Sequence, residues 1–434
     1  MKIVILGGGF GGLKLARALA GKTNFEVLLI DKFNYHQFQP LFYQVATAGL
    51  DASNISFPLR KVFHNVKNFR FCMAEVQQVL PESKEVLTDV GKFGYDKLVI
   101  ATGAGTNFFG NRQMESNAFP MKSTPEALQI RHKLLHNFED ASRTKEVLKR
   151  KRLLTTVIVG GGPTGVELSG AIADMRRFVL PKDFPELDFA EMKIYLVEGM
   201  SKLLNGMSEK SSKDALKYLE NLGVIVLLNQ IVKEYNGDTV ILNDGTRIES
   251  KMVIWAAGIR GNVPLGINPN IIVRGNRIQV NREMEVMGLH DVYALGDIAF
   301  MEEPAWPKGH PQVAPVAIQQ AALLARNLVS EGKGILPKQF SYKDKGVMAT
   351  VGRNLAVVDV PKPKLHFKGF IAWFIWMSLH LMLILGVKNR FFVFWNWVYN
   401  YFTKDQNLRL IFKEFYRDSA QNIKPVAREL TTHS

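Results

Sequence analysis

Two glycine-rich runs, about 150 residues apart, contain the residue types and spacing best suited to chemistry in this chain. Gly7, Gly9 and Gly12 give the first run the pattern G-x-G-x-x-G, and Asp31 follows it at a strand end. In this pattern the first glycine allows a tight turn, the second lets the backbone approach a pyrophosphate, and the third lets a helix pack on a strand. The N–H groups at the helix start bind phosphate oxygens. Asp31 can accept the ribose hydroxyl hydrogens, so the run predicts a dinucleotide site.

The second run repeats the pattern with Gly160, Gly162 and Gly165, and Glu198 is its acid. The gap to this acid is longer than usual, and residues 176–190, which contain two prolines, indicate an inserted loop. A carboxylate at this position accepts a hydrogen bond from a ribose 2′-hydroxyl and repels a 2′-phosphate. We therefore expect NADH rather than NADPH at the second site.

The elements that must position these residues are short apolar strands and the helices that follow them. Each glycine run comes directly after a predicted buried strand, at residues 2–6 and 154–159, and opens a helix; each acid ends the next strand. This context makes a glycine pattern informative. The fold class predicted is α/β, with two Rossmann-like dinucleotide-binding domains. Three further predicted strands end in residues suited to lining a cofactor, namely Thr102, Gly103, Gly258 and Asp297.

In this order the motifs resemble the flavoprotein superfamily that has two dinucleotide-binding domains. The resemblance implies one non-covalent FAD at the first run, with Asp297 bonded to its ribityl chain, and NADH as a substrate at the second run. It implies an FAD-binding domain made of residues 1–118 and 259–345 and an NADH-binding domain of residues 119–258. Residues 346–434 would form a C-terminal membrane-associated region.

The chain has a single cysteine, Cys72. It therefore lacks both an internal disulfide and a redox-active cysteine pair, and no cysteine-rich metal cluster can form. No metal-ligand spacing is present, and no metal site is expected. The flavin must then pass its electrons directly to an outside acceptor.

Two apolar segments near the C-terminus indicate where that acceptor lies. Residues 369–387 carry no formal charge, and residues 391–402 are rich in aromatic side chains, with lysine and arginine on the flanks of both. Nineteen helical residues reach about 28 Å, barely a bilayer core. A spanning helix, a buried core and an interfacial helix all remain open. Aromatic residues with a basic fringe favour amphipathic helices lying in the headgroup layer, with residues 365–410 on an anionic membrane surface.

With these features the whole chain resembles the type II NADH dehydrogenases, which are NADH:quinone oxidoreductases. Residues 38–47 (FQPLFYQVAT) resemble a family stretch near the isoalloxazine, which implies a cofactor role for Thr47. Glu167 matches the family glutamate near nicotinamide and quinone. Residues 314–320 (APVAIQQ) resemble the quinone motif A-Q-x-A-x-Q, with Ala317 beside the cofactor. Pro315 departs from that motif, so Gln319 becomes the better candidate for a hydrogen bond to quinone.

The resemblance implies hydride transfer from NADH to FAD and then transfer of two electrons to menaquinone or ubiquinone, without proton pumping. It also implies a homodimer. The sequence shows no targeting segment, and we therefore expect a protein bound peripherally at the cytoplasmic face of a prokaryotic cell membrane. A soluble NADH-dependent ferredoxin or rubredoxin reductase is the alternative, although it would not need residues 373–402. The net charge of +15 also permits a nucleic-acid-binding flavoprotein. The basic residues near the C-terminus stand beside apolar runs, however, so no nucleic-acid partner is expected.

Overall fold

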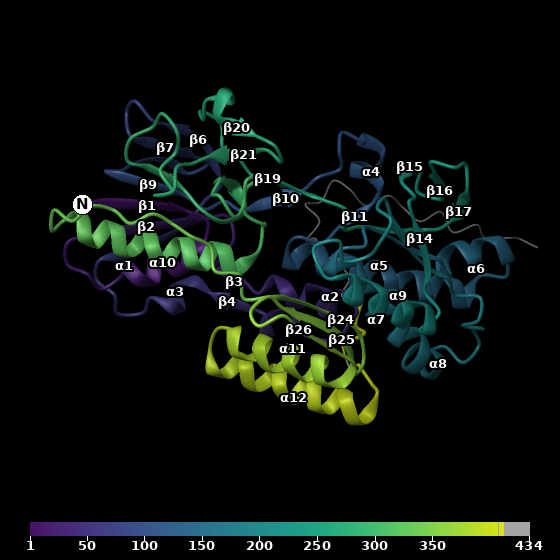
Figure 1. The fold of residues 1–434 in the computed structure, drawn as a ribbon. Coiled ribbons are helices and arrows are strands. Elements are labelled where there is room, and N and C mark those ends of the chain that lie inside the picture. Colours follow the sequence, from purple (N-terminus) through teal and green to yellow (C-terminus); the bar gives the residue numbers. More distant parts are fainter. Residues whose placement is uncertain (407, 412–434) are drawn as a thin grey trace, which may run out of the picture.

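A computed structural model describes residues 1–406 and 408–411, and two parallel sheets organise them (Figure 1). The first sheet consists, in spatial order, of β22 (Val292–Ala294), β9 (Lys97–Ile100), β1 (Lys2–Leu6), β2 (Glu26–Asp31) and β5 (Phe69–Met73). Its central strands are buried apolar runs, as parallel strands covered on both faces must be. Helices α1 (Phe10–Leu19) and α10 (Ala314–Glu331) lie side by side against it (Figure 1).

The second sheet repeats this arrangement with a different part of the chain. It consists of β11 (Phe119–Pro120), β18 (Met252–Trp255), β12 (Thr156–Val159), β13 (Ile194–Glu198) and β14 (Ile225–Leu228), all parallel. Helix α7 (Pro163–Phe178) follows β12 as α1 follows β1. Two strand–turn–helix units on parallel sheets are the α/β class that the sequence predicts.

The chain passes between the two sheets along a pair of antiparallel strands, β10 (Ala104–Thr106) and β19 (Ile259–Gly261). Helix α5 (Thr124–Arg143) is capped by Ser123, whose side chain accepts a hydrogen bond from the N–H of Glu126. The remaining elements before residue 345 are β3 (Tyr35–Gln37), α2 (Phe42–Ala46), β4 (Ser56–Pro58), α3 (Leu59–Val62), β6 (Val76–Leu80), β7 (Glu85–Thr88), β8 (Gly91–Gly94), α4 (Arg112–Asn117), α6 (Val147–Leu154), α8 (Leu180–Asp183), α9 (Glu209–Asn221), β15 (Val232–Tyr235), β16 (Thr239–Leu242), β17 (Arg247–Glu249), β20 (Ile272–Val273), β21 (Arg277–Gln279) and β23 (Ala299–Phe300).

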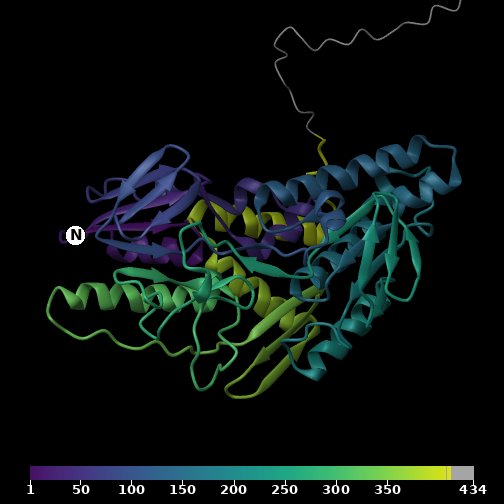
Figure 2. The same cartoon turned by 90° about the horizontal axis from the view of Figure 1, so that it is seen from above.

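The C-terminal region folds as a small antiparallel sheet followed by two helices. Its strands are β24 (Val347–Gly352), β25 (Leu355–Val360) and β26 (Leu365–Lys368), and its helices are α11 (Gly369–Leu383) and α12 (Val387–Thr403). The two helices lie along the lower side of the molecule in Figure 1, beneath both halves, and in the view from above they cross its middle (Figure 2). Of the predicted region 346–434, residues 407 and 412–434 lie outside the described residues.

The uncharged run 369–387 does not form one long helix, because the chain turns within it. Helix α11 ends at Leu383, and Gly386 has a φ of +80° at the start of α12. A Cβ atom on Gly386 would lie 2.4 Å from the ring of Phe57, so the turn needs glycine. Within the described part of the chain, no helix combines the length and apolar character needed to cross a membrane.

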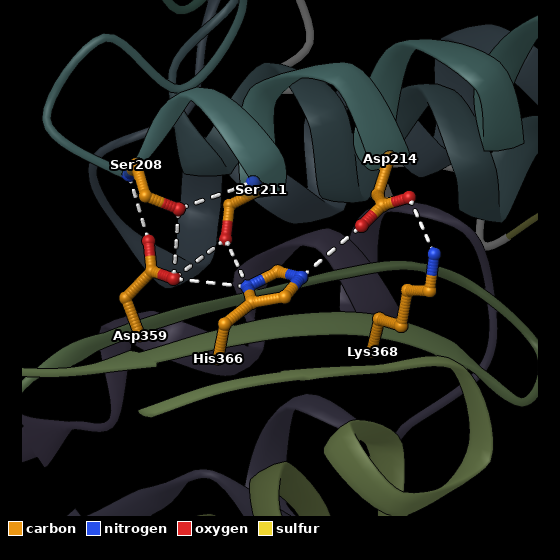
Figure 3. A network of polar contacts seen from close by, with 6 residues as sticks. All are labelled: Ser208, Ser211, Asp214, Asp359, His366 and Lys368. Carbon is orange, nitrogen blue, oxygen red and sulfur yellow. Dashed lines mark hydrogen bonds and ion pairs between the residues drawn. The ribbon is translucent and has the colours of Figure 1, made fainter. Parts of the chain in front are cut away.

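A polar network joins α9 of the second half to the C-terminal sheet (Figure 3). The carboxylate of Asp359 accepts hydrogen bonds from the N–H of Ser208 at 2.7 Å and from the hydroxyl of Ser211 at 2.9 Å. The ring of His366 stands between Asp359 and Asp214, with each nitrogen 3.1 Å from a carboxylate oxygen. Partial burial acts to raise the pKa of Asp359, but these hydrogen bonds outweigh it and the pKa lies below its usual range.

Candidate active site between two dinucleotide turns and the C-terminal helices

The first glycine turn has the geometry that its spacing predicts. Gly7 has a φ of +100°, and a Cβ atom there would lie 2.4 Å from the carbonyl oxygen of Ala101. A Cβ atom on Gly12 would lie 1.9 Å from the carbonyl oxygen of Gly7, whereas one on Gly9 would meet nothing within 4 Å. The turn is therefore tight at its first glycine, closely packed at its third and open at its second, where a pyrophosphate would approach.

Asp31 lies beside this turn at the end of β2. Its carboxylate accepts hydrogen bonds from the N–H groups of Gly8 at 2.5 Å and Phe33 at 2.7 Å. Burial raises the pKa of Asp31, and the two hydrogen bonds oppose that effect. The side chain is thus fixed at the edge of the turn, at the position expected to meet a ribose.

The second glycine turn has nearly the same geometry. Gly160 has a φ of +110°, a Cβ atom on Gly165 would lie 1.9 Å from the carbonyl oxygen of Gly160, and one on Gly162 would meet nothing within 4 Å. Glu198 accepts hydrogen bonds from the N–H groups of Gly161 at 2.5 Å and Met200 at 2.7 Å. The protein therefore has two open phosphate-sized turns, each with a carboxylate fixed beside it, as two dinucleotides require.

The remaining predicted cofactor residues lie at the ends of strands near the two turns. Thr102 donates a hydrogen bond to the carbonyl of Asn262 at 2.7 Å, and Gly103 has a φ of +66°. Gly258 directly precedes β19, one of the two strands that join the two sheets. Its carbonyl accepts a hydrogen bond from the N–H of Asn107 at 3.0 Å. Ala317, on the first turn of α10, is buried near Gly11 and Gly296.

Asp297 stands three residues after β22 in a partly buried position. Burial raises its pKa, while the positive charges of Lys122 and Arg277 act to lower it. Lys122 is itself desolvated, and this burial lowers the pKa of its ammonium group. The carboxylate of Asp297 therefore lies within electrostatic reach of Lys122, which follows β11, and of Arg277, on β21. These charged surroundings are suited to the polar chain of a bound flavin.

Glu167 lies on the first turns of α7, where two cavities meet. The smaller cavity is bounded by Lys122, the segment around Phe42 and Thr164, which belongs to the second glycine turn. The larger, of about 160 Å³, extends from Glu167 towards the C-terminal helices. Glu167 and Tyr43 line both cavities. A carboxyl group here can exchange protons with either side.

The surroundings of Glu167 favour its protonated form. Burial raises its pKa to about 8, although interactions with the backbone of Thr350 and the side chain of Trp376 partly oppose this. The hydroxyl of Tyr43 lies 3.1 Å from that of Thr350 and accepts a hydrogen bond from the amide of Gln44 at 2.9 Å. At neutral pH Glu167 therefore carries a proton that it can donate.

Helix α12 closes the larger cavity through polar contacts with the first domain. The indole N–H of Trp397 donates to the side chain of Gln44 at 2.7 Å, and the amide of Asn400 donates to the carbonyl of Gly49 at 3.1 Å. The amide of Asn389 reaches the carbonyl of Asn54 at 3.1 Å. The C-terminal helices are therefore part of the cavity wall.

Two residues predicted from the resemblance, Thr47 and Gln319, lie in different parts of the structure. Thr47 lines the larger cavity, and its hydroxyl donates to the carbonyl of Tyr43 at 2.9 Å. The structure does not bring Gln319 to Glu167. Both ends of the Gln319 amide bind the backbone of Lys343, at 2.9 and 3.1 Å. Its neighbour Gln320 is buried and accepts a hydrogen bond from the N–H of Gly296 at 2.7 Å.

Several residues of the larger cavity were not predicted from the sequence, among them Tyr43, Asp174, Thr350 and Trp376. Asp174 had a usable signal, because it lies seven residues after Glu167 and so on the same face of one helix. Thr350 and Trp376 come from β24 and α11, which approach Glu167 only through tertiary packing.

The outer faces of α11 and α12 are apolar and exposed. On α11 the buried residues Ala372, Trp376 and His380 form one stripe, yet the opposite face is apolar as well. A helix that is apolar on all sides is suited to a protein core or a membrane rather than to water. The exposed side chains of this surface, here called the apolar face, are Phe370, Ile371, Phe374, Leu379, Met382, Leu383, Val387, Phe391, Phe392, Phe394, Trp395, Tyr399 and Phe402.

Comparison with known proteins identifies the class and then the family. Residues 1–321 match the family model for pyridine nucleotide-disulphide oxidoreductases, and the chain belongs to that class. Residues 345–404 match the NDH2 C-terminal domain. The type II NADH:quinone oxidoreductase Ndh of Mycobacterium tuberculosis is 35% identical over 411 residues, which cover 91% of this chain and 87% of that protein. The chain is therefore a member of the type II NADH:quinone oxidoreductase family.

Other similar proteins agree with this membership. The mitochondrial external NADH-ubiquinone oxidoreductase 2 of Saccharomyces cerevisiae is 28% identical, with 92% of this chain and 81% of that protein covered. The solved structure of NDH2 from Plasmodium falciparum in complex with NADH has the same fold, with a TM-score of 0.85 at 22% identity over 95% of this chain and 99% of that one. Membership confirms the predicted fold class, NADH:quinone oxidoreductase activity, FAD and NADH.

Proposed function

We propose that this chain oxidises NADH at the second glycine turn and reduces a membrane quinone in the larger cavity, at the surface of a membrane. The observation that carries this proposal is the position of Glu167, which borders both the cavity at Thr164 of the second glycine turn and the one beside the C-terminal helices. The overall reaction is NADH + H⁺ + quinone → NAD⁺ + quinol. Bound FAD supplies the chemistry that accepts a hydride from NADH and passes the electron pair on.

The residues proposed to bind the cofactors follow the two turns and the strand ends around them. FAD would be held by Gly7, Gly9, Gly12, Asp31, Thr47, Thr102, Gly103, Asp297 and Ala317. NADH would be held by Gly160, Gly162, Gly165, Glu198 and Gly258. The proposed domain boundaries stay at residues 1–118 with 259–345, 119–258 and 346–434.

Glu167 is proposed to deliver a proton to the quinone oxygen. Its pKa of about 8 keeps the carboxyl group protonated at neutral pH, so the proton is already in place when the quinone binds. The buried side chain of Trp376 gives this end of the cavity an aromatic wall. Gln319 stays the proposed contact of the second quinone oxygen. It lies outside the lining of the larger cavity, so this contact requires the side chain to move towards the quinone and to give up one of its two hydrogen bonds to Lys343.

The apolar face is proposed to lie in the headgroup layer of an anionic membrane. Lys388 and Arg390 stand at its edge in α12, where they can reach lipid phosphates. The family expectation is a homodimer at the cytoplasmic face of the cell membrane, with menaquinone or ubiquinone as the acceptor. Light scattering in detergent tests the dimer, and turnover with a naphthoquinone and a benzoquinone of equal chain length tests the acceptor.

Vesicle binding tests the apolar face with two matched substitutions. Phe374, on α11, belongs to the apolar face and is 60% exposed. Leu336 follows the end of α10, is 85% exposed and does not belong to the apolar face, so it serves as the control. Burying a large apolar side chain contributes about 1.5–3 kcal/mol, so Phe374→Glu should weaken binding to anionic vesicles by at least about tenfold. Leu336→Glu should leave binding unchanged. Equal effects of the two substitutions would contradict the proposed orientation.

Anaerobic stopped-flow absorbance near the flavin band tests the reaction. NADH should bleach the band of the detergent-purified protein rapidly, and a short-chain quinone should then restore it. Bleaching without recovery on addition of quinone would favour the soluble reductase alternative, in which the acceptor is a protein. Absence of a flavin band after gentle purification would contradict the FAD assignment.

A further inference from the structure

A second carboxyl group lines the larger cavity, and the proposed reaction leaves it without a role. Asp174 lies seven residues after Glu167 on α7. Two helical turns place the two residues about 10 Å apart along the axis and on nearly the same face. Both border the same cavity, which continues from Glu167 past Asp174 to the end of α12.

The two ends of this cavity differ in polarity. The Glu167 end is walled by aromatic side chains, and Trp376 there is almost completely buried. The other end is lined by Arg353, Asp405 and Lys404, and Lys404 is exposed to solvent. The rings of Tyr401 and Phe178 lie against Arg353 and Lys404, so this opening combines charged groups with aromatic ones. The charged groups at a solvent-facing opening suit water and protons.

The space between the two carboxyl groups is large enough for water. At about 30 Å³ for each molecule, a cavity of about 160 Å³ holds roughly five waters. About three waters in a hydrogen-bonded row span 10 Å, since neighbouring oxygens are about 2.8 Å apart. The hydroxyls of Tyr43 and Thr350 and the carboxyl groups themselves provide the polar partners that such waters need.

We propose that Asp174 is the proton-entry residue of this enzyme, taking a proton from water at the charged opening and passing it through cavity water to Glu167. The proposal rests on the proposed reduction of quinone beside Glu167. One proton from the medium is consumed for each NADH oxidised, and this route would supply it. Glu167 gives its proton to the quinone oxygen, and the proton from Asp174 replaces it, so that only O–H bonds form and break along the route.

The charges around Asp174 suit a group that gains and loses a proton. Burial raises its pKa to about 6, while the backbone N–H of Arg353, 2.8 Å away, and the charges of Arg353 and Arg177 act to lower it. Lys404 and Asp405 also face the cavity after α12, and Tyr43 faces it from α2. The pKa of Glu167 is higher, at about 8, so transfer from Asp174 to Glu167 is downhill.

The test is Asp174→Asn, because an asparagine oxygen can still accept the hydrogen bond from Arg353. Stopped-flow absorbance separates the two half-reactions of the FAD-loaded protein. Reduction of the flavin by NADH should stay within about twofold of wild type. Reoxidation by a short-chain quinone should slow by about tenfold at pH 8, less than the ~10²–10⁴-fold contributed by a group that transfers a proton directly. The defect should shrink at pH 6, where protons are abundant.

Two further variants and an isotope measurement complete the test. Asp174→Glu should restore reoxidation, and Asp140→Asn, at an exposed carboxylate on α5, should behave as wild type. Reoxidation of Asp174→Asn in D₂O should slow more than that of wild type. Equal reoxidation rates for wild type and Asp174→Asn from pH 6 to 9 would overturn the proposal, as would equal slowing of both half-reactions. Failure of quinone to reoxidise the wild-type protein would instead contradict the proposed function.

Discussion

Replacing Glu167 by glutamine should stabilise the folded protein above pH 5 while it impairs quinone reduction. The pKa of Glu167 is about 8 in the folded chain against 4.5 for an ordinary glutamate. Between these values the folded state binds more protons than the unfolded state. The stability of the wild type therefore falls as the pH rises from 4.5 to 8, and glutamine removes this loss because it does not ionise.

The size of the effect follows from the shift in pKa. Each pKa unit is worth about 1.36 kcal/mol, so the full shift corresponds to roughly 4–5 kcal/mol above pH 8. Glu167 keeps part of its contact with solvent, and we expect about half of this value. A chain of 434 residues has an unfolding entropy of about 0.9 kcal/mol per kelvin, which converts the gain to about 2–3 °C in Tm.

The assay is thermal unfolding in detergent, followed by flavin fluorescence from pH 5 to pH 9. The Tm of Glu167→Gln should equal that of wild type near pH 5 and exceed it by about 2–3 °C at pH 9. Glu186→Gln makes the same chemical change at an exposed position and should show no such trend. Reoxidation of the Glu167 variant by quinone should slow by about 10²-fold. A Tm difference that does not change with pH would refute the reasoning.

Three other predictions concern the two dinucleotide turns and the polar network of Asp359 between α9 and the C-terminal sheet. Glu198→Gln should raise the ratio of kcat/KM for NADPH to that for NADH by at least about tenfold, or ~1.4 kcal/mol, since a charge that repels the 2′-phosphate is lost; an unchanged ratio in steady-state assays would contradict this. Gly9→Ala should fold but lose flavin, whereas Gly12→Ala should lose the folded first domain, as circular dichroism and the flavin-to-protein ratio will show; a normal melt for the Gly12 variant would be inconsistent with the 1.9 Å approach. Asp359→Asn should lower Tm by about 1–3 °C at pH 7. Because the pKa of Asp359 is lowered by folding, this difference should vanish as the pH falls below the ordinary value of 3.8, and a constant difference would argue against a role for its charge.

The dinucleotide turns could be predicted from the sequence because their geometry is encoded locally. In both turns, a Cβ atom added to the third glycine, Gly12 or Gly165, would lie 1.9 Å from the carbonyl oxygen of the glycine five residues earlier. Strand, turn and helix follow one another within about 20 residues, so spacing alone carries the information. The two acids could be placed for the same reason, since each ends the next strand of its sheet.

The larger cavity could not be predicted in the same way. Tyr43, Glu167, Thr350 and Trp376 come from four elements that are far apart in the sequence, and only tertiary packing brings them together. Nor does the quinone motif reveal that the amide of Gln319 binds the backbone of Lys343. The uncharged run 369–387 predicts the apolar character of α11 but not its length. The helix ends within the run, because the chain turns at Gly386 against the ring of Phe57.

The hydrogen bonds that hold α12 to the first domain affect how a detergent-free form of this enzyme could be engineered. Trimming the chain before α12 would remove the partners of Gln44 and Gly49 and take away one side of the larger cavity. Such a truncated protein would lose the proposed acceptor site together with the proposed contact with lipid. Redesign should instead keep both helices and replace only outward-facing side chains such as Phe374 and Phe391 with polar ones. Water solubility and quinone turnover could then be varied independently.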